Sequence, residues 1–111
     1  MERKLRLNKS ADIQLVRRSG KSYQHPLFIL IVMHVEPEEP ARVGIIATKS
    51  VGGAVQRNRA KRLLRTAVFN CYSRLPKGIR ILLIARAPLA KSNIHAAEPA
   101  LEEQLKKAGL I

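Results

Sequence analysis

The chain has 111 residues, of which 46% are hydrophobic, which is enough for one domain with a modest core and too apolar for a wholly disordered basic peptide. No apolar run approaches the roughly 20 residues of a membrane helix, and the charged N-terminus lacks the apolar segment of a secretory signal. The single cysteine, Cys71, excludes an internal disulfide and a cysteine-based zinc site, so we expect an unsecreted, cytoplasmic protein.

Charge is distributed very unevenly along the chain. Lys and Arg total 21 against 8 Asp and Glu, which gives a formal net charge of +13. Residues 40–97 include twelve basic residues and no acidic one, so this stretch cannot neutralise its charge through internal ion pairs. Such a surface repels itself unless it meets a polyanion, which favours a nucleic acid as the partner. A membrane surface is the weaker alternative, because the apolar stretches have the pattern of a core.

The first predicted element is a helix over residues 11–18. Ser10 is suited to cap its N-terminus, and Gly20 is suited to end it. Ile13 and Val16 share one side of this helix and predict its buried face.

Strands are predicted next. Residues 27–32 form a continuous β-branched and aromatic run, which is typical of a strand buried on both faces. Residues 36–40 predict a turn, because the two prolines in this segment have no backbone N–H to donate to a sheet. Residues 42–48 predict a second strand, which we expect to pair antiparallel with the first.

A long helix is predicted over residues 54–72, after a break at residues 51–53 that contains two glycines. Residues 79–85 predict a further strand. A last helix covers about residues 98–107, with Pro99 in its first turn, although its start could lie as early as Ser92. The long helix carries apolar residues at spacings of three and four, which predict its buried face: Ala60, Leu63, Leu64, Ala67, Val68 and Cys71.

The order of these elements indicates the fold class. A strand, a helix and a strand over residues 43–85 imply a parallel pair within a mixed sheet. We therefore expect a single RNA-binding domain over residues 1–111, of the α+β class in a two-layer α/β arrangement. It should contain a mixed sheet of about four strands and three helices, in the order α-β-β-β-α-β-α, which has one strand more than the residue patterns above locate.

The decisive segment for function lies in the long helix, at residues 56–65. At about 100° per residue, most of its basic residues fan over one broad face, and Arg59 falls at the far edge of the apolar stripe. Like charges four residues apart destabilise a helix, so this face is better explained by a polyanionic partner than by solvation. Arginine binds phosphate through two parallel hydrogen bonds, and Asn58 can read a base edge or hold a 2′-hydroxyl.

The same segment is similar to a known family. Residues 43–55 read VGIIATKSVGGAV, residues 57–65 read RNRAKRLLR, and residues 84–86 read IAR. These motifs resemble the signature of the bacterial ribonuclease P protein subunit. The resemblance implies a protein that binds a large catalytic RNA, in a complex that removes the 5′ leader from precursor tRNA. It also implies a left-handed β-α-β crossover, whereas general rules of handedness predict a right-handed one.

The resemblance further implies two RNA-binding sites. The long helix should lie against the RNA subunit near the cleavage region, and a cleft between the first helix and the sheet should take the single-stranded leader. The expected contacts with the RNA subunit are Arg57, Asn58, Arg59, Lys61, Arg62 and Arg65. The expected contacts with the leader are Ile13, Arg17, Phe28, Lys49 and Arg86.

The chain departs from the family on its first helix. Relatives commonly carry aromatic residues there, where this chain has Ile13 and Arg17. Phe69 and Tyr72 are at least as well suited to a core. We therefore expect electrostatic contacts with the leader backbone, through Arg17 and its basic neighbours Arg18 and Lys21, in place of base stacking.

No independent catalytic or metal site is expected. The basic stretch offers no carboxylate, and the three histidines have no ligand spacing, so Mg²⁺ should be held mainly by phosphates of the RNA subunit. Gly52 and Gly53 could cradle a phosphate or simply form a turn. The alternative function is a structural RNA-binding module such as a ribosomal protein. The expected partners are the catalytic RNA and precursor tRNA, with neither a membrane nor a protein partner.

Overall fold

The computed structural model describes residues 5–111. Along this part of the chain the elements follow the order helix, three strands, helix, strand, helix, so the predicted α+β class and element order are confirmed. Short 3-10 helices separate several of them: η2 (Lys49–Val51), η3 (Tyr72–Arg74) and η4 (Ala87–Lys91). The main elements are α1 (Ser10–Ser19), β1 (Lys21–Gln24), β2 (Phe28–His34), β3 (Arg42–Ile46), α2 (Ala54–Cys71), β4 (Ile79–Ala85) and α3 (Ile94–Lys107).

The four strands form one mixed sheet in the order β1-β2-β4-β3. The predicted parallel pair is confirmed, because β3 runs parallel to β4 and α2 connects the two. The predicted antiparallel pair of residues 27–32 with residues 42–48 is wrong, because β4 lies between β2 and β3. Strand β4 matches the length of β2 and pairs with it over seven positions, so it takes the inner place and the shorter β3 takes the edge. The left-handed sense of the crossover stays a prediction.

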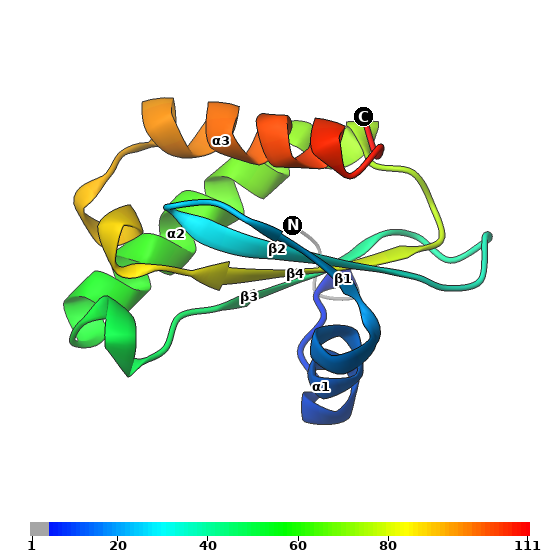
Figure 1. The fold of residues 1–111 in the computed structure, drawn as a ribbon, viewed down its shortest axis with the longest axis horizontal. Coiled ribbons are helices and arrows are strands. Elements are labelled where there is room, and N and C mark those ends of the chain that lie inside the picture. Colours follow the sequence, from blue (N-terminus) through cyan, green and yellow to red (C-terminus); the bar gives the residue numbers. More distant parts are fainter. Residues whose placement is uncertain (1–4) are drawn as a thin grey trace.

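The helices cover the sheet unequally. Figure 1 shows α2 and α3 on one face and α1 alone on the other. The larger apolar cluster lies under α2 and α3, and a smaller one, including Val16 of α1 and Leu82 of β4, lies under α1. Alternate residues of β2 contribute to each cluster, so its predicted burial on both faces is confirmed. One face of α1 is therefore left to border an open part of the sheet.

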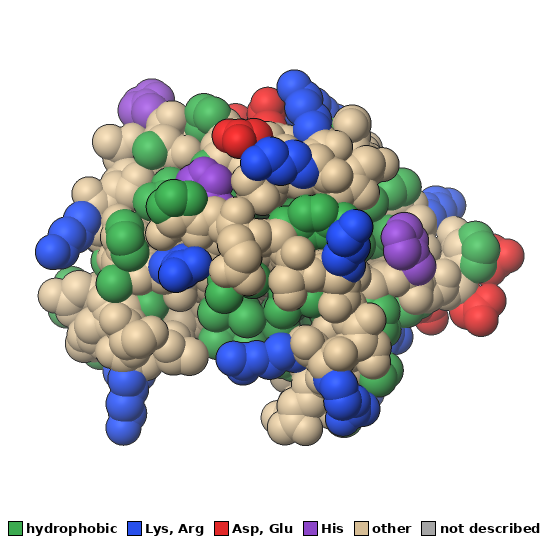
Figure 2. Space-filling view, viewed as in Figure 1, with side chains coloured by type: hydrophobic (Ala, Val, Ile, Leu, Met, Phe, Trp, Pro, Cys, Tyr) green, Lys and Arg blue, Asp and Glu red, His purple; other side chains and the backbone are tan. Residues whose placement is uncertain are grey.

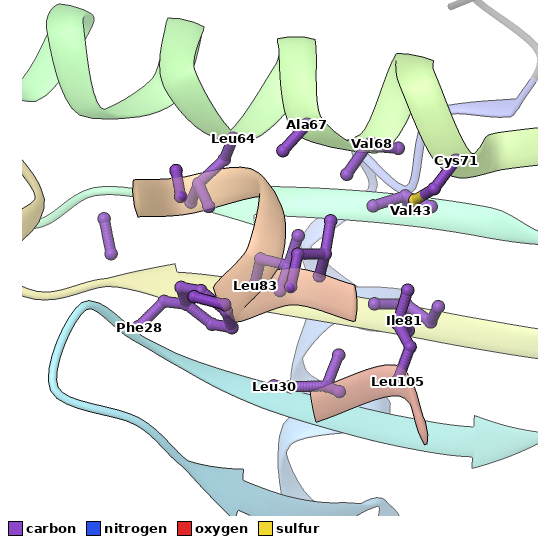
Figure 3. Packing of buried hydrophobic residues seen from close by; sticks show 14 of the residues in the cluster. Phe28, Leu30, Val43, Leu64, Ala67, Val68, Cys71, Ile81, Leu83 and Leu105 are labelled. Atoms are coloured by element: carbon purple, nitrogen blue, oxygen red, sulfur yellow. The ribbon is translucent and has the colours of Figure 1, made fainter. Parts of the chain in front are cut away.

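The buried stripe of α2 follows the predicted spacing. Figure 3 shows Leu64, Ala67, Val68 and Cys71 pointing from α2 towards the sheet. Leu63, at the edge of the stripe, is only partly buried. Burial raises the pKa of the Cys71 thiol, which keeps it in the neutral, unreactive form. Since this stripe packs inwards, the opposite side of α2 faces away from the core.

Several predicted element ends differ from those of the structure. Ser10 is the first residue of α1 and makes no capping hydrogen bond, so the predicted Ser10 cap is wrong. The last helix begins at Ile94, where the Asn93 side chain accepts a hydrogen bond from the Ala96 amide at 3.2 Å. Pro99 consequently lies inside α3 and not in its first turn. None of the helices in residues 5–111 is long and apolar enough to cross a membrane.

Candidate nucleic-acid interface

An open cleft of about 820 Å³ lies between α1 and the sheet, on the face that α2 and α3 do not cover. Its floor is apolar, because Ile29 of β2 and Ile84 of β4 are register partners there. The carboxyl ends of the parallel strands β3 and β4 meet at this edge of the sheet, which is a common position for ligand sites in open α/β sheets. The other lining residues are Arg17, Gln24, His25, Pro26, Thr48, Ser50, Ala85, Arg86, Ala87 and Pro88.

The rim of the cleft is polar and cationic. Figure 2 shows green apolar side chains within a hollow below the sheet, with blue Lys or Arg side chains beside it. The Arg86 guanidinium donates to Gln24 Oε1 at 3.2 Å, which holds it at the rim. The hydroxyls of Thr48 and Ser50 share a hydrogen bond of 2.8 Å. An apolar floor with guanidinium groups at its margin suits a single strand, whose bases are apolar on their faces and whose phosphates are anionic.

His25 is a further lining residue that the sequence analysis missed. Its Nδ1 accepts a hydrogen bond from the Leu27 amide at 3.0 Å, and its ring stacks on Phe28 with 5.2 Å between centroids. With Nδ1 engaged as an acceptor, Nε2 carries the proton of the neutral ring and is the donor left for a ligand. Gln24, Thr48 and Ser50 were missed as well, since short polar loop residues carry no periodic pattern.

The predicted leader contacts fall into different places. Arg17 and Arg86 line the cleft, and Lys49 is exposed on η2 between two lining residues. Ile13 packs against the smaller apolar cluster under α1 and is only partly buried. Phe28 is fully buried in the larger cluster on the opposite face of the sheet. Its predicted direct contact with a leader is therefore wrong, because no part of the ring reaches the surface.

The predicted RNA-facing residues of α2 also differ among themselves. Asn58, Arg62 and Arg65 are exposed, whereas Arg57 and Lys61 are partly buried. Within residues 5–111, no ion pair or side-chain hydrogen bond is recorded for any of these five. Their donors are therefore available to an external acceptor, as an RNA-binding face requires.

Arg59 is used differently. Its Nε donates to the Ala90 carbonyl at 2.9 Å, and its Nη2 donates to the Ser92 carbonyl at 2.7 Å. Both acceptors belong to the segment around η4, so the guanidinium ties this segment to α2. Arg59 lies at the edge of the apolar stripe of α2, as the sequence predicted. It therefore stands between the core and the exposed face of the helix. Part of its hydrogen-bonding capacity thus maintains the fold.

Five of the seven acidic residues within residues 5–111 are engaged away from the exposed face of α2. Asp12 and Glu39 both lie near Arg80 of β4, at 3.6 and 3.9 Å. On α3, Glu98 accepts a hydrogen bond from Asn70, and Glu102 pairs with Arg74. The carboxylates therefore offset charge at the sheet and at the end of α2, and leave the cations of the Arg-Asn-Arg segment uncompensated.

The glycine turn before α2 shows a backbone requirement. Gly52 has a φ of 140°, which side chains rarely tolerate, and a Cβ there would lie 2.9 Å from the Cβ of Gln56. This supports the turn interpretation, while a phosphate cradle stays a prediction. Among the described residues, no group of three or more His, Cys, Asp or Glu side chains could hold a metal ion.

Comparison with protein families gives one clear match. A family model described as Ribonuclease P matches residues 1–109. The ribonuclease P protein component of Brevibacillus brevis is 36% identical over 111 residues, which cover 100% of this chain and 88% of that protein. The corresponding protein of Listeria monocytogenes serotype 4b is 33% identical over 106 residues, covering 96% of this chain and 89% of that one.

Solved structures show the same likeness in three dimensions. The RNase P protein of Staphylococcus aureus superposes with a TM-score of 0.84 at 29% identity and covers 96% of both chains. The RNase P protein of Thermotoga maritima gives a TM-score of 0.80 at 27% identity, over 92% of this chain and 96% of that one. The resemblance therefore extends over more than nine tenths of the chain in both cases.

Proposed function

Because this chain belongs to the ribonuclease P protein family and is therefore a component with an RNA partner, we propose that it binds a catalytic RNA and the 5′ leader of precursor tRNA. The complex would cleave the precursor endonucleolytically to give the mature 5′ end. The exposed face of α2 binds the RNA subunit, and the cleft under the sheet binds the leader.

One observation carries this proposal: the two cationic surfaces lie on opposite faces of the sheet. The face of α2 with Asn58 and Arg62 is on one side, and the cleft with Arg17 and Arg86 is on the other, while Arg65 of α2 lies at the β3 edge of the sheet. Two RNA segments can therefore be bound at the same time without competing. This arrangement suits a protein that brings a substrate to a second RNA.

The two surfaces perform different tasks. On α2, guanidinium groups neutralise phosphates of the RNA subunit, which lowers the repulsion between two polyanions. In the cleft, Arg17 and Arg86 contact the leader backbone, while Ile29 and Ile84 provide an apolar floor for bases. We assign the hydrolysis and the Mg²⁺ ions mainly to the RNA, because its phosphates supply the oxygen ligands that Mg²⁺ prefers.

Reconstitution tests this proposal. The purified chain alone should leave precursor tRNA intact at every Mg²⁺ concentration, and should bind Mg²⁺ weakly at most. Added to the cognate catalytic RNA, it should permit cleavage at lower salt and lower Mg²⁺. Cleavage by the protein alone that survives digestion of contaminating RNA would overturn the proposal. Recovery of the tagged protein with ribosomal particles, and not with one RNA of a few hundred nucleotides, would favour a structural module instead.

A further inference from the structure

The exposed side of α2 extends beyond the Arg-Asn-Arg segment to an aromatic residue. Asn58, Arg62, Arg65 and Phe69 follow one another at spacings of four, three and four residues, so they form one row along the helix, here termed the α2 ridge. All four are exposed. The Phe69 side chain is 67% exposed, in a chain whose other phenylalanine is fully buried.

The rest of the described chain leaves Phe69 uncovered. Helix α3 packs against a different side of α2, where Asn70 donates to Glu98 and Arg74 pairs with Glu102. Neither apolar cluster includes Phe69. Phe69 therefore contributes little to the fold, and its ring is exposed to a partner, as aromatic residues at interfaces commonly are before binding.

The charges around Phe69 indicate what kind of partner covers it. Arg65 lies one helical turn away, about 6 Å along the axis, and Arg62 lies one turn further. A partner that contacts the ridge must thus offer anionic groups next to a flat apolar surface. Single-stranded RNA has this combination, because each base presents a π-face beside its phosphate.

A second copy of the chain is a poor fit for the same surface. A symmetric contact across α2 would bring Arg62 and Arg65 of both copies together, and like charges in an interface are strongly unfavourable. An RNA partner has the opposite charge. We propose that Phe69 is a stacking platform for an unpaired nucleobase of the RNA that binds α2. This inference rests on the proposed function, since it extends the surface assigned there to the RNA subunit.

Substitutions of Phe69 test the stacking directly. Affinity for the cognate catalytic RNA is measured without tRNA, so that the cleft does not contribute. Phe69→Ala and Phe69→Leu should each weaken binding by roughly 5- to 140-fold, the range that loss of one base stack supports. Phe69→Tyr should bind as the wild type does, because it keeps the ring. All variants should unfold at the wild-type temperature.

A matched control separates stacking on α2 from a general loss of exposed apolar surface. Leu15 is 37% exposed on α1, on the face of the sheet away from α2, and is not aromatic. Leu15→Ala should change the RNA affinity less than twofold. Equal losses for Leu15→Ala and Phe69→Ala would overturn the stacking role. Retention of wild-type affinity by Phe69→Leu would also overturn it, because the ring would then be dispensable.

A spectroscopic readout gives independent evidence. The chain contains no tryptophan, so Phe69→Trp introduces a unique fluorophore. RNA binding should quench its emission and protect it from acrylamide, whereas a Leu15→Trp reporter on α1 should respond weakly. Stacking is refuted if Phe69→Ala and Phe69→Leu bind RNA normally and the emission of Phe69→Trp does not change on binding. If Arg62→Ala weakens RNA binding in the same experiment, the proposed function stands. If Arg62→Ala also has no effect, the proposed function itself fails. A Phe69-dependent dimer with unchanged RNA affinity would likewise refute stacking.

Discussion

The Arg59 guanidinium donates from Nε to the carbonyl oxygen of Ala90 at 2.9 Å, across 31 positions of sequence. The sequence places Arg59 within an RNA-binding motif, but the structure also gives it a role in the fold. Arg59 joins α2 to the turn that follows β4, and this turn borders the cleft. The two surfaces proposed to bind RNA are thus connected through one side chain.

Arg59→Ala should therefore lower the stability of the isolated protein. The free energy of unfolding should fall by about 1 kcal/mol. This is less than the loss of a buried charge-assisted hydrogen bond causes, because the Arg59 side chain is exposed. Arg62→Ala is the matched control, since Arg62 makes no such bond within residues 5–111, and it should change stability by under about 0.5 kcal/mol. Urea unfolding measures both. Equal free energies of unfolding for the two variants would contradict a structural role of Arg59.

The salt dependence of RNA binding should report the phosphate contacts of α2. For each contact removed, the slope of log affinity against log salt should become shallower by about 0.7 on single strands or 0.9 on duplex. Arg62→Ala and Arg65→Ala should each show this change. Lys107→Ala is the control, because Lys107 lies on α3 and pairs with Glu103 at 3.5 Å. An equal change of slope for Lys107→Ala would indicate that the overall positive charge of the protein attracts the RNA, without specific phosphate contacts of α2.

The ion pair between Asp12 and Arg80 should fix the position of α1. Arg80 and Arg42 are neighbours in the β3–β4 register, and the buried Nε atom of each has no partner among the described groups. Asp12 therefore compensates a concentration of positive charge beneath α1. Asp12→Asn should loosen α1 and reduce the preference for precursor over mature tRNA, while affinity for the RNA subunit stays unchanged.

Two measurements check this role of Asp12. Hydrogen exchange of the α1 amides should accelerate in Asp12→Asn and not in Glu38→Gln, which alters an exposed acid without a recorded ion pair among the described residues. Substrate affinity should fall only in the first variant. Faster exchange without any loss of substrate preference would show that α1 does not position the leader.

The parts of the fold with strong local patterns could be predicted from sequence. Helix α2 and strand β4 match their predicted ranges within one residue, because long periodic or continuous apolar segments determine their own structure. Residue patterns did not locate β1, whose four residues are mostly exposed and gain their structure by pairing with β2. The pairing of β3 was also mispredicted, since apolar runs do not encode their neighbours in a sheet.

The candidate site could be predicted only in part, for a similar reason. Arg17 and Arg86 have recognisable charges and motif positions, and both line the cleft. Phe28 was assigned to the wrong face, because a strand buried on both sides has no polar alternation to reveal which residues face which layer. His25 lies in a short connection, and its approach to the cleft depends on the assembled sheet.

The most direct test of the account measures substrate affinity with and without the protein, on leaders shortened stepwise to none. The protein-dependent gain should decline as the leader shortens and disappear on leaderless tRNA, because only a leader can fill the cleft. Arg17→Ala and Arg86→Ala should reduce the gain on the full-length leader and have no effect on leaderless tRNA. A gain that persists unchanged on leaderless tRNA would contradict the assignment of the cleft.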